Sequence, residues 1–420
     1  MILSNSDLKK VTYWIEKNDF KRIALQFPPE FISLAPKISK SIEIAISGKR
    51  CVFILGDTAY GSCCVDEVGA EHYGADCVIH FGYCCGSPPQ RLPTFCLYWA
   101  DSEKIPTAYI NELASSVQND LLVVCDPHFA DLELSTVAGL YAAGLRGGRI
   151  ILAETVREMI PGKIPRVKLF GRKLSTFVSS NVGIIKRMDL KDFDKSKMTT
   201  VFIGDRNSPL FARLLLECPD GSLLCLSRGE SGWLKPEKTS NFQVTMRRYA
   251  GVEAVKRAER IGVLYGSSAL EGVREARDGL ALGLRNVGKQ VHGFCVGKLT
   301  EEKLGNFSEI DCFVILACGD FLNSQIISNK FHCPIVSAYE AALALGFHEW
   351  DGTITTDLNK INWNLQEKSN ESENFADFLK SLIPVNTRGY SGLDKNITTN
   401  VAKIEPGLSG IPARYNSEGK

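Results

Sequence analysis

The chain has 420 residues, of which 44% are hydrophobic and 23% charged, and its formal net charge is +1 at pH 7. This is the composition of an ordinary globular protein, and the length predicts two or three domains. The balanced charge gives no electrostatic basis for binding nucleic acid or a membrane surface, and no apolar stretch approaches the length of a transmembrane helix. The first ten residues lack the apolar core of a secretion signal, so we expect a cytoplasmic protein whose 14 cysteines are reduced.

The first hundred residues predict alternating helices and strands. A helix capped by Ser6 is expected to place Leu8, Val11 and Ile15 on one face. Strands are predicted over 22–27, 48–56 and 75–81, and helices over the stretches that end near 46 and 73. Strands that alternate with helices in this way are typical of parallel βαβ units.

A weaker copy of this order is predicted in the middle of the chain and a clearer copy near its end. The middle strands cover 121–126, 149–152, 167–171, 200–205 and 223–226. The later strands cover 260–266, 288–297 and 310–318, with a long helix that ends near Val287. Asp76-Cys77 and Asp311-Cys312 take equivalent positions in the first and last copies, which indicates an internal duplication.

These copies predict an α/β fold of three small parallel-sheet βαβ domains, Rossmann-like, in a pseudo-threefold arrangement. We assign 1–104, 105–232 and 233–384 to the three domains, and 385–420 to a carboxyl-terminal tail. Residues 364–374 are rich in Asn, Ser, Glu and Gln, and we expect them to form a solvated linker or loop.

Cysteines follow predicted strands at three positions, Cys63-Cys64, Cys84-Cys85 and Cys318. Ligands gather at the carboxyl ends of strands in α/β sheets, so thiols drawn there from two distant parts of the chain indicate a shared metal or iron–sulfur site. No two cysteines have CxxC spacing, which argues against a zinc ribbon, a ferredoxin-type cluster and a thioredoxin-type site. Adjacent residues of an extended chain point in different directions, so we expect only one cysteine of the first doublet to bind.

The remaining cysteines are interpreted as structural. Four of them lie inside predicted strands and are expected to pack in the core: Cys51, Cys77, Cys295 and Cys312. The others follow no pattern: Cys96, Cys125, Cys218, Cys225 and Cys333.

Other motifs add little to the functional prediction. Gly283–Gln290 nearly fits the Walker A pattern, but it follows a predicted helix and precedes a strand, the reverse of the required order. No GxGxxG follows the first strand of any copy, so a nicotinamide enzyme is not supported. His80 is expected to be a hydrogen-bonded core residue. Asp57 is expected either to cap the next turn or to brace the cysteine loop, and Met246–Arg260 predicts a solvated basic helix face.

Several segments together resemble the diphthamide synthase family. They are Gly56–Asp66, His80–Gly82, Met246–Tyr249, Val296–Leu299 and Leu316–Cys318, and Gly407–Tyr415 resembles the tail of the family's second subunit. The resemblance covers nearly the whole chain. It implies three domains that meet at a [4Fe–4S] cluster, where S-adenosylmethionine binds and is cleaved. It also implies transfer of the resulting 3-amino-3-carboxypropyl group to a histidine of translation elongation factor 2.

The middle domain departs from the catalytic pattern of this family. The catalytic paralogue has a cysteine where the segment Leu169–Lys173 places Arg172, and the family's second subunit shares that loss. The resemblance therefore implies an iron–sulfur subunit that is not catalytic alone and that forms a heterodimer with the catalytic paralogue. Its expected role is to help keep the paralogue's cluster reduced, with electrons from a small reductant protein.

The same resemblance implies the cluster ligands. They are Cys64, Cys85 and Cys318, with Cys63 as the alternative within the first doublet. No residue of this chain is assigned a catalytic role. Two other functions stay open at this point: an autonomous S-adenosylmethionine-cleaving radical transferase, and a scaffold subunit that holds no cluster.

Overall fold

The computed structural model describes most of the chain up to Trp363. The described residues are 4–56, 61–99, 103–117, 119–145, 149–163, 168–179, 185–189, 198–218, 221–240, 242–266, 270–297, 299–322, 331–348, 350, 355–361, 363, 410–411 and 414–415. The chain divides into two units, Met1–Ile383 and Pro384–Lys420. The predicted loop at 364–374, Asp57 and most of the tail segment lie outside the described residues. No helix in the described part of the chain is long and apolar enough to cross a membrane.

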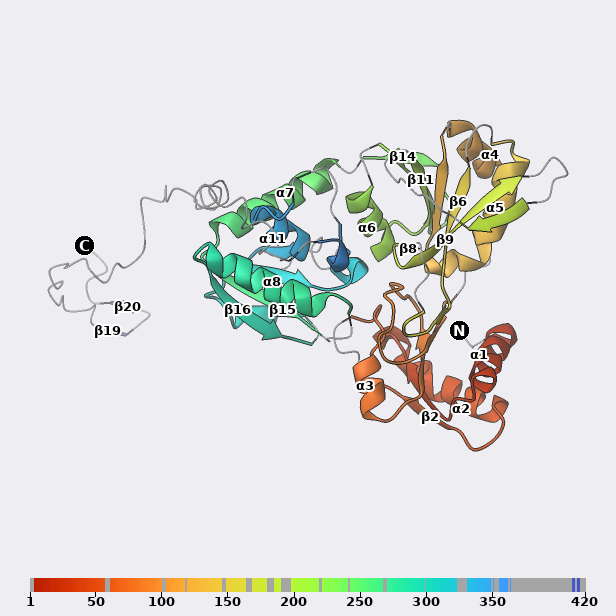
Figure 1. Ribbon diagram of the computed structural model, residues 1–420, viewed down its shortest axis with the longest axis horizontal. Coiled ribbons are helices and arrows are strands. Elements are labelled where there is room, and N and C mark those ends of the chain that lie inside the picture. Colours follow the sequence, from red (N-terminus) through yellow and green to blue (C-terminus); the bar gives the residue numbers. More distant parts are fainter. Residues whose placement is uncertain are drawn as a thin grey trace. The chain divides into compact units, whose positions relative to one another are not determined.

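The described strands of the first unit form three sheets. In Figure 1, where colour follows the sequence, the main strands of the first sheet are red to orange, those of the second yellow to green, and those of the third green to blue. The first has parallel strands β1 (Arg22–Gln26), β2 (Cys51–Ile54), β3 (Cys77–Phe81) and β4 (Thr94–Leu97). The second has β5 (Leu121–Cys125), β6 (Ile150–Glu154), β11 (Thr199–Gly204) and β12 (Leu223–Gly229). The third has β15 (Arg260–Tyr265), β16 (Gln290–Cys295), β17 (Cys312–Leu316) and β18 (Ile335–Ser337).

Each set of four parallel strands has the same order in space. The orders are β2-β1-β3-β4, β6-β5-β11-β12 and β16-β15-β17-β18, so the first strand of each set lies between its second and third. This repetition confirms the predicted α/β class with three parallel-sheet repeats. The carboxyl ends of equivalent strands thus occupy equivalent edges of their sheets, where the cysteine-bearing loops begin.

Hydrogen bonds repeat between the first and third sheets as well. The Asp76 carboxylate accepts hydrogen bonds from the backbone N–H groups of Lys21 and Arg22 at 2.7 and 2.9 Å. The Asp311 carboxylate accepts from the two equivalent N–H groups at the start of β15 at 3.0 and 2.8 Å. In both sheets the aspartate before the third strand therefore ties it to the start of the first strand, as expected of a duplicated unit.

Helices cover both faces of the first sheet. They are α1 (Asn5–Lys17), α2 (Ala35–Ala45) and α3 (Glu67–His72), and a 3₁₀ turn, η1 (Pro29–Leu34), precedes α2. Trp14 of α1 and Ile42 of α2 are buried against one face, and Ala70 of α3 against the other. The predicted cap of α1 was wrong, because Ser4 accepts the hydrogen bond of the Asp7 N–H at 3.0 Å and Ser6 lies inside the helix.

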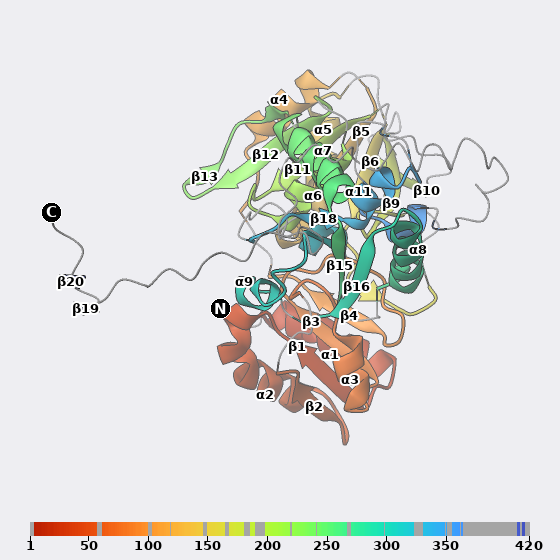
Figure 2. The same cartoon turned by 90° about the vertical axis from the view of Figure 1, so that its left-hand side faces the viewer.

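The other helices of the first unit complete these layers. They are α4 (Thr107–Ser116), α5 (Glu133–Ala142), α6 (Pro209–Glu217), α7 (Phe242–Arg257), α8 (Val273–Asn286), α9 (Glu301–Gly305) and α11 (Ala338–Ala344). Figure 2 and Figure 1 both show α7 beside α11. Arg248 of α7 is buried there and forms an ion pair with Glu340, so the expectation of a solvated basic face was wrong at this residue.

Antiparallel strands extend the first two sheets in ways that the sequence did not predict. The predicted strand at 167–171 is the short β8 (Lys168–Leu169), which turns at Phe170 and Gly171 into β9 (Arg172–Ser179) beside β6. The further additions are β7 (Glu158–Met159) beside β4, β10 (Ile185–Asp189) beside β9, and β13 (Gly232–Trp233) and β14 (Glu237–Thr239) beside β12. β7 lies in the predicted second domain but pairs with the first sheet, and β14 lies in the predicted third domain but pairs with the second sheet. The domain ranges given above stay a prediction.

Two of the cysteines expected in the core are exposed. Cys77 and Cys312 are fully buried in β3 and β17, as predicted. Cys51 and Cys295 lie in β2 and β16, the edge strands of their sheets, and both are exposed. The prediction of burial was wrong for Cys51 and Cys295, because a strand at the edge of a sheet has a neighbouring strand on one side only and its side chains are covered less completely.

Candidate metal centre

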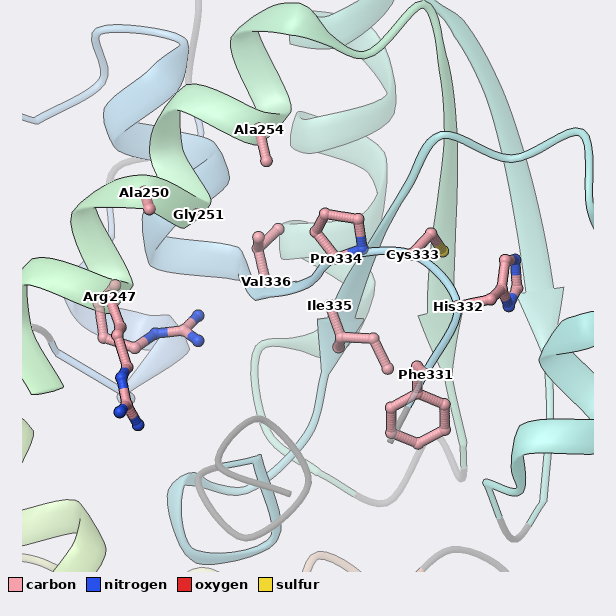
Figure 3. Close-up of a pocket in the computed structure, with 11 residues that line it drawn as sticks. Arg247, Ala250, Gly251, Ala254, Phe331, His332, Cys333, Pro334, Ile335 and Val336 are labelled. Atoms are coloured by element: carbon pink, nitrogen blue, oxygen red, sulfur yellow. The ribbon is translucent and has the colours of Figure 1, made fainter. Parts of the chain in front are cut away.

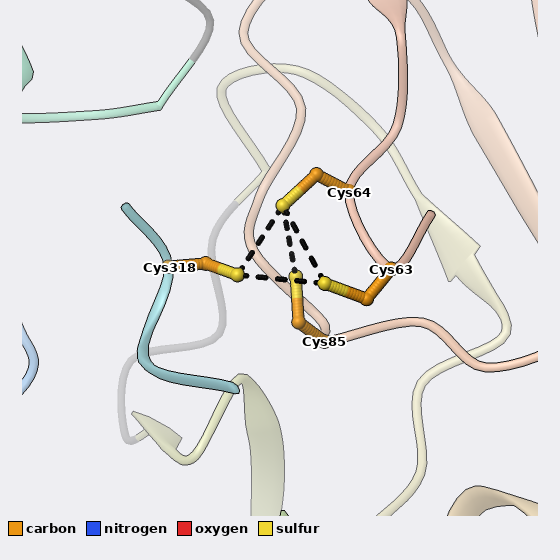
Figure 4. A group of neighbouring side chains, drawn as sticks. All are labelled: Cys63, Cys64, Cys85 and Cys318. Atoms are coloured by element: carbon orange, nitrogen blue, oxygen red, sulfur yellow. Dashed lines mark hydrogen bonds between the residues drawn. The ribbon is translucent and has the colours of Figure 1, made fainter. Parts of the chain in front are cut away.

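Four cysteine thiols from distant parts of the chain lie together in one group. Its members are Cys63, Cys64, Cys85 and Cys318, whose sulfur atoms all lie within 4.8 Å of one another. The nearest pair is Cys64 and Cys318 at 3.2 Å, and Cys63 lies 3.6 Å from Cys318. Figure 4 shows the four side chains pointing toward a common centre from three segments of backbone. We call this set the four-cysteine group.

The loops that carry the group follow strands of the first and third sheets. Cys63 and Cys64 lie between β2 and α3, Cys85 follows β3, and Cys318 follows β17. The Cys85 N–H donates to the Cys63 carbonyl at 3.0 Å, which fixes the first two loops to each other. Gln26, at the end of β1, donates to the Cys64 carbonyl at 2.7 Å and accepts from the Asp66 N–H at 2.9 Å. Gln26 therefore braces the cysteine doublet, a role that nothing in its sequence context indicated.

Both members of the first doublet face the group. Their sulfur atoms lie 3.8 Å apart, so the expectation that adjacent residues diverge was wrong here. The reason is local geometry, because the chain turns at Ser62 and Cys63, and the Cys64 N–H bonds back to the Gly61 carbonyl at 3.3 Å. The alternation of directions that holds in extended strands does not apply to a turn.

Burial and mutual hydrogen bonding set the protonation of the thiols. Cys63, Cys85 and Cys318 are less than 10% exposed, and Cys64 is partly exposed. Hydrogen bonds from the thiols of Cys318, Cys63 and Cys64 lower the pKa of Cys85 well below its ordinary value. The hydrogen bond with Cys318 raises the pKa of Cys63 well above it. Among these thiols, Cys85 is therefore the one whose pKa is shifted toward the thiolate, the form that binds metal.

The donor set fits a thiophilic metal centre. Four sulfurs without a carboxylate are typical of zinc or an iron–sulfur cluster, whereas magnesium and calcium need oxygen ligands. Zn–S bonds of about 2.3 Å in a tetrahedron place sulfurs about 3.8 Å apart. Four sulfur pairs of the group lie 3.2–3.8 Å apart and all its sulfurs lie within 4.8 Å, which is close to the spacing around a single ion. An iron–sulfur cube is wider than one ion and requires the same thiols to lie farther apart.

A buried polar network beside the group joins all three sheet regions. The Tyr83 hydroxyl donates to Asp320 at 2.7 Å, and Arg213 of α6 donates to Asp320 at 3.2 Å and to Glu217 at 2.8 Å. Thr356 donates to the same Glu217 oxygen at 2.5 Å. Burial raises the pKa of Asp320 to about 6 against the attraction of Arg213. Tyr83 and Asp320 each lie two residues from a cysteine of the group, so the network fixes both loops.

The middle domain touches the cysteine loops through backbone. Gly86, next to Cys85, and Gly171, next to Arg172, both have positive φ angles of 69°. A Cβ on Gly171 would lie 2.6 Å from the Cys85 carbonyl oxygen. Arg172 is buried, and its guanidinium donates to Thr155 at 2.5 Å and pairs with Glu133 at 3.5 Å. Arg172 therefore stands beside the group's loops, but its side chain is engaged in an ion pair.

We expect Gly171→Ala to disturb the four-cysteine group through this contact. The added methyl group collides with the Cys85 carbonyl oxygen. In addition, residue 171 has a left-handed backbone conformation, which costs an alanine about 1–2 kcal/mol by itself. Gly144→Ala is the matched control, because Gly144 also has a positive φ, 76°, and no atom lies within 4 Å of its Cβ position. Chemical unfolding should show Gly171→Ala to be less stable than the control by at least about 1 kcal/mol. Equal stability of the two variants would contradict the close contact.

His80 occupies the position that its sequence context predicted. It is fully buried in β3, and its Nε2 lies 3.0 Å from the Ser62 carbonyl oxygen, just before the cysteine doublet. Burial lowers the pKa of His80, so the imidazole is neutral. This residue belongs to the core and supports the first cysteine loop by hydrogen bonding.

A separate hollow lies along α7. Figure 3 shows it between α7 and the segment Phe331–Val336, and its volume is about 380 Å³. Arg247 and His332 contribute polar groups to its wall. The hollow shares no residue with the four-cysteine group, and the convergence of thiols makes that group the candidate functional site.

Comparisons with known proteins agree with this geometry. Residues 27–355 match the sequence model of a family described as "Putative diphthamide synthesis protein". The chain is 28% identical to a protein of Danio rerio over 83% of this chain and 69% of that protein, and 30% identical to one of Xenopus laevis over 84% and 70%. Both are named "2-(3-amino-3-carboxypropyl)histidine synthase subunit 2".

Solved structures show the same fold. One is described as "Crystal structure of Dph2 from Pyrococcus horikoshii with 4Fe-4S cluster", and it aligns with a TM-score of 0.56 over 82% of this chain and 92% of that chain. A second structure of the same archaeal protein aligns with a TM-score of 0.54. Sequence identity is 16% in both cases, so these alignments show a shared fold.

Proposed function

The chain belongs to the diphthamide synthesis family, and we propose that it is the iron–sulfur subunit of a heterodimeric 2-(3-amino-3-carboxypropyl)histidine synthase. Such an enzyme transfers the 3-amino-3-carboxypropyl group of S-adenosylmethionine to a histidine of translation elongation factor 2, the first step of diphthamide biosynthesis. The observation that carries the proposal is the four-cysteine group, in which thiols from the first and third sheets converge. The names of the relatives and the fold shared with a cluster-binding archaeal protein support it.

We assign the binding of a [4Fe–4S] cluster to Cys64, Cys85 and Cys318, with Cys63 as the alternative within the doublet. All four thiols lie close enough for any three of them to act together. When bound, such a cluster supplies one-electron transfer at a potential that depends on burial and on hydrogen bonds to sulfur. The buried setting and the Phe321 N–H, which donates to the Cys318 sulfur at 3.4 Å, are features of this chain that would adjust that potential.

The role we assign to this subunit is electron supply to its catalytic paralogue. Arg172 stands where the catalytic paralogue has its middle-domain cysteine, and its guanidinium is committed to Glu133 and Thr155. A site without a middle-domain thiol differs from the catalytic pattern, while the retained cysteines still suit redox work. The complex would therefore need the paralogue for S-adenosylmethionine cleavage and a small protein reductant as the source of electrons.

A heterodimer that carries Cys318→Ser in this chain and an intact paralogue tests this role. The two chains are co-expressed, co-purified anaerobically and assayed for modification of elongation factor 2. With dithionite, which reduces the paralogue directly, we expect modification near the normal rate. With the protein reductant we expect a strong decrease, because the relay through this chain is broken.

The matched control is Cys312→Ser in the same heterodimer, because Cys312 is also buried at β17 but lies outside the four-cysteine group. This control should keep its activity with both reductants. Equal loss of activity of Cys318→Ser with dithionite and with the protein reductant would refute the relay, since this chain would then take part in the chemical step. Failure of the two chains to co-purify would refute the heterodimer.

One observation favours a second candidate. The sulfur contacts of 3.2–3.8 Å match four thiolates around a single zinc ion, which would make the chain a scaffold subunit that holds no cluster. Acid-labile sulfide separates the candidates, because an iron–sulfur cluster contains it and a zinc site does not.

A further inference from the structure

A second set of metal-binding side chains lies in the first sheet. The register of β3 and β4 places His80 directly beside Cys96, so both side chains project from the same face of the sheet. Cys84 follows β3 and reaches the same place. One ring nitrogen of His80 and the sulfurs of Cys84 and Cys96 all lie within 4.8 Å of one another. The three residues are at most 4% exposed, and none of them belongs to the four-cysteine group.

The hydrogen bonding of His80 prepares it to bind a metal. Its Nε2 lies 3.0 Å from the Ser62 carbonyl, and a carbonyl can only accept, so Nε2 carries the proton. Nδ1 then has a free lone pair, and it is buried without a hydrogen-bond partner. A buried nitrogen without a partner is costly and requires an explanation. A histidine that donates one ring N–H to a backbone carbonyl and offers the other nitrogen is the usual arrangement of a metal ligand.

We propose that His80, Cys84 and Cys96 bind one zinc ion inside the first sheet. Two thiolates and a neutral imidazole around Zn²⁺ give a site with no net charge, which a fully buried position favours. Two thiolates and one imidazole are a donor set that zinc uses with a fourth ligand. In a tetrahedral site, bonds of about 2.3 Å to sulfur and about 2.1 Å to nitrogen place the donors about 3.6–3.8 Å apart. The three donors already lie within 4.8 Å of one another, so binding an ion requires them to close by at most about 1 Å.

The ion would join β3, β4 and the loop that leads into the four-cysteine group. Cys84 directly precedes Cys85, and His80 holds the carbonyl before Cys63. A zinc bound there would stiffen the two loops of the first sheet that carry the group's thiols. The inference rests on its own residues, and it stands or falls separately from the iron–sulfur proposal.

The test measures zinc and iron in the full-length chain, purified anaerobically with its native metals. After incubation with zinc chloride and removal of unbound metal, we expect one zinc per chain and no loss of iron. Cys96→Ala should lower zinc occupancy about tenfold or more and leave iron unchanged. Cys77→Ala is the matched control, because Cys77 is fully buried in β3 but packs in the core on the opposite face. It should retain zinc.

X-ray absorption at the zinc edge of the unmutated protein gives a readout that does not depend on how a variant folds. We expect sulfur and nitrogen neighbours in the ratio set by two cysteines and one histidine. Four sulfur neighbours, or zinc that appears only as iron is lost and disappears in Cys318→Ser, would place the ion in the four-cysteine group and overturn the inference. Unchanged zinc in Cys96→Ala would overturn it as well.

Discussion

Replacing Cys318 by serine should remove most of the iron and sulfide from the anaerobically purified chain. Cys318 is the one member of the four-cysteine group that comes from the third sheet, and its sulfur lies 3.2 Å from Cys64 and 3.6 Å from Cys63. A serine hydroxyl is a poor substitute for a soft thiolate ligand of iron–sulfur clusters. Cys85→Ser should have the same effect, because the Cys85 sulfur belongs to the same group and lies 3.8 Å from the Cys64 sulfur. Iron and sulfide analysis with the visible absorption spectrum measures the loss.

Variants of the doublet and of the strand cysteines complete this experiment. Cys64→Ser should lower cluster content more than Cys63→Ser if the assignment within the doublet is right. Cys77→Ser and Cys312→Ser should leave the content unchanged, because both residues are buried outside the four-cysteine group. Full iron occupancy in Cys318→Ser would contradict the assignment of Cys318 as a cluster ligand.

Arg213→Met should destabilise the first unit strongly. The variant keeps most of the side-chain volume but leaves two carboxylates, Asp320 and Glu217, without their cation in a buried place. Removal of one partner from a buried ion pair typically costs about 3–5 kcal/mol. Although burial opposes its charge, these two carboxylates raise the pKa of Arg213, which shows how closely the three groups depend on one another. Urea unfolding followed by tryptophan fluorescence measures the change.

The matched control for this variant is Arg149→Met. Arg149 pairs with Asp120 at 2.8 Å, but its side chain is 58% exposed, and such surface pairs contribute about 0–1 kcal/mol. The destabilisation of Arg213→Met should also shrink on acidification. Burial raises the pKa of Asp320 to about 6 even though Arg213 lowers it, so the loss of Arg213 should raise this pKa further. Protonation of Asp320 then removes the penalty of its unpaired charge as the pH falls toward 6 and below. If Arg213→Met lowered the free energy of unfolding at pH 8 by no more than Arg149→Met does, the structural role of the network would be contradicted.

The sequence alone was sufficient to predict the repeated architecture and to predict that cysteine thiols from distant parts of the chain lie together. The alternation of predicted helices and strands and the paired Asp-Cys positions located the repeats, because each feature is local in the chain. Parallel strands place their carboxyl ends at one edge of a sheet, so cysteines after β3 and β17 were expected to share a site. The structure brings both cysteines of the first doublet together with Cys85 and Cys318, whereas Cys84 lies outside this group.

Other parts of the site depend on contacts that no local pattern records. Arg213 and Asp320 are 107 residues apart, and nothing near either residue indicates the other. Gln26 looks like an ordinary polar residue at the end of a strand, yet it braces the cysteine loop. Cys96 followed no pattern in the sequence, because its proximity to His80 arises from the register of two strands. The direction of Cys63 depended on a turn whose geometry the sequence did not specify.

The most direct test of the proposed function is the count of iron and acid-labile sulfide in the anaerobically purified chain. The proposal predicts the four irons and four sulfides of a [4Fe–4S] cluster per chain, and a paramagnetic signal after one-electron reduction. The same counts should fall together in Cys318→Ser. A chain without labile sulfide that instead holds zinc, and loses that zinc in Cys318→Ser, would contradict the iron–sulfur assignment and favour the scaffold.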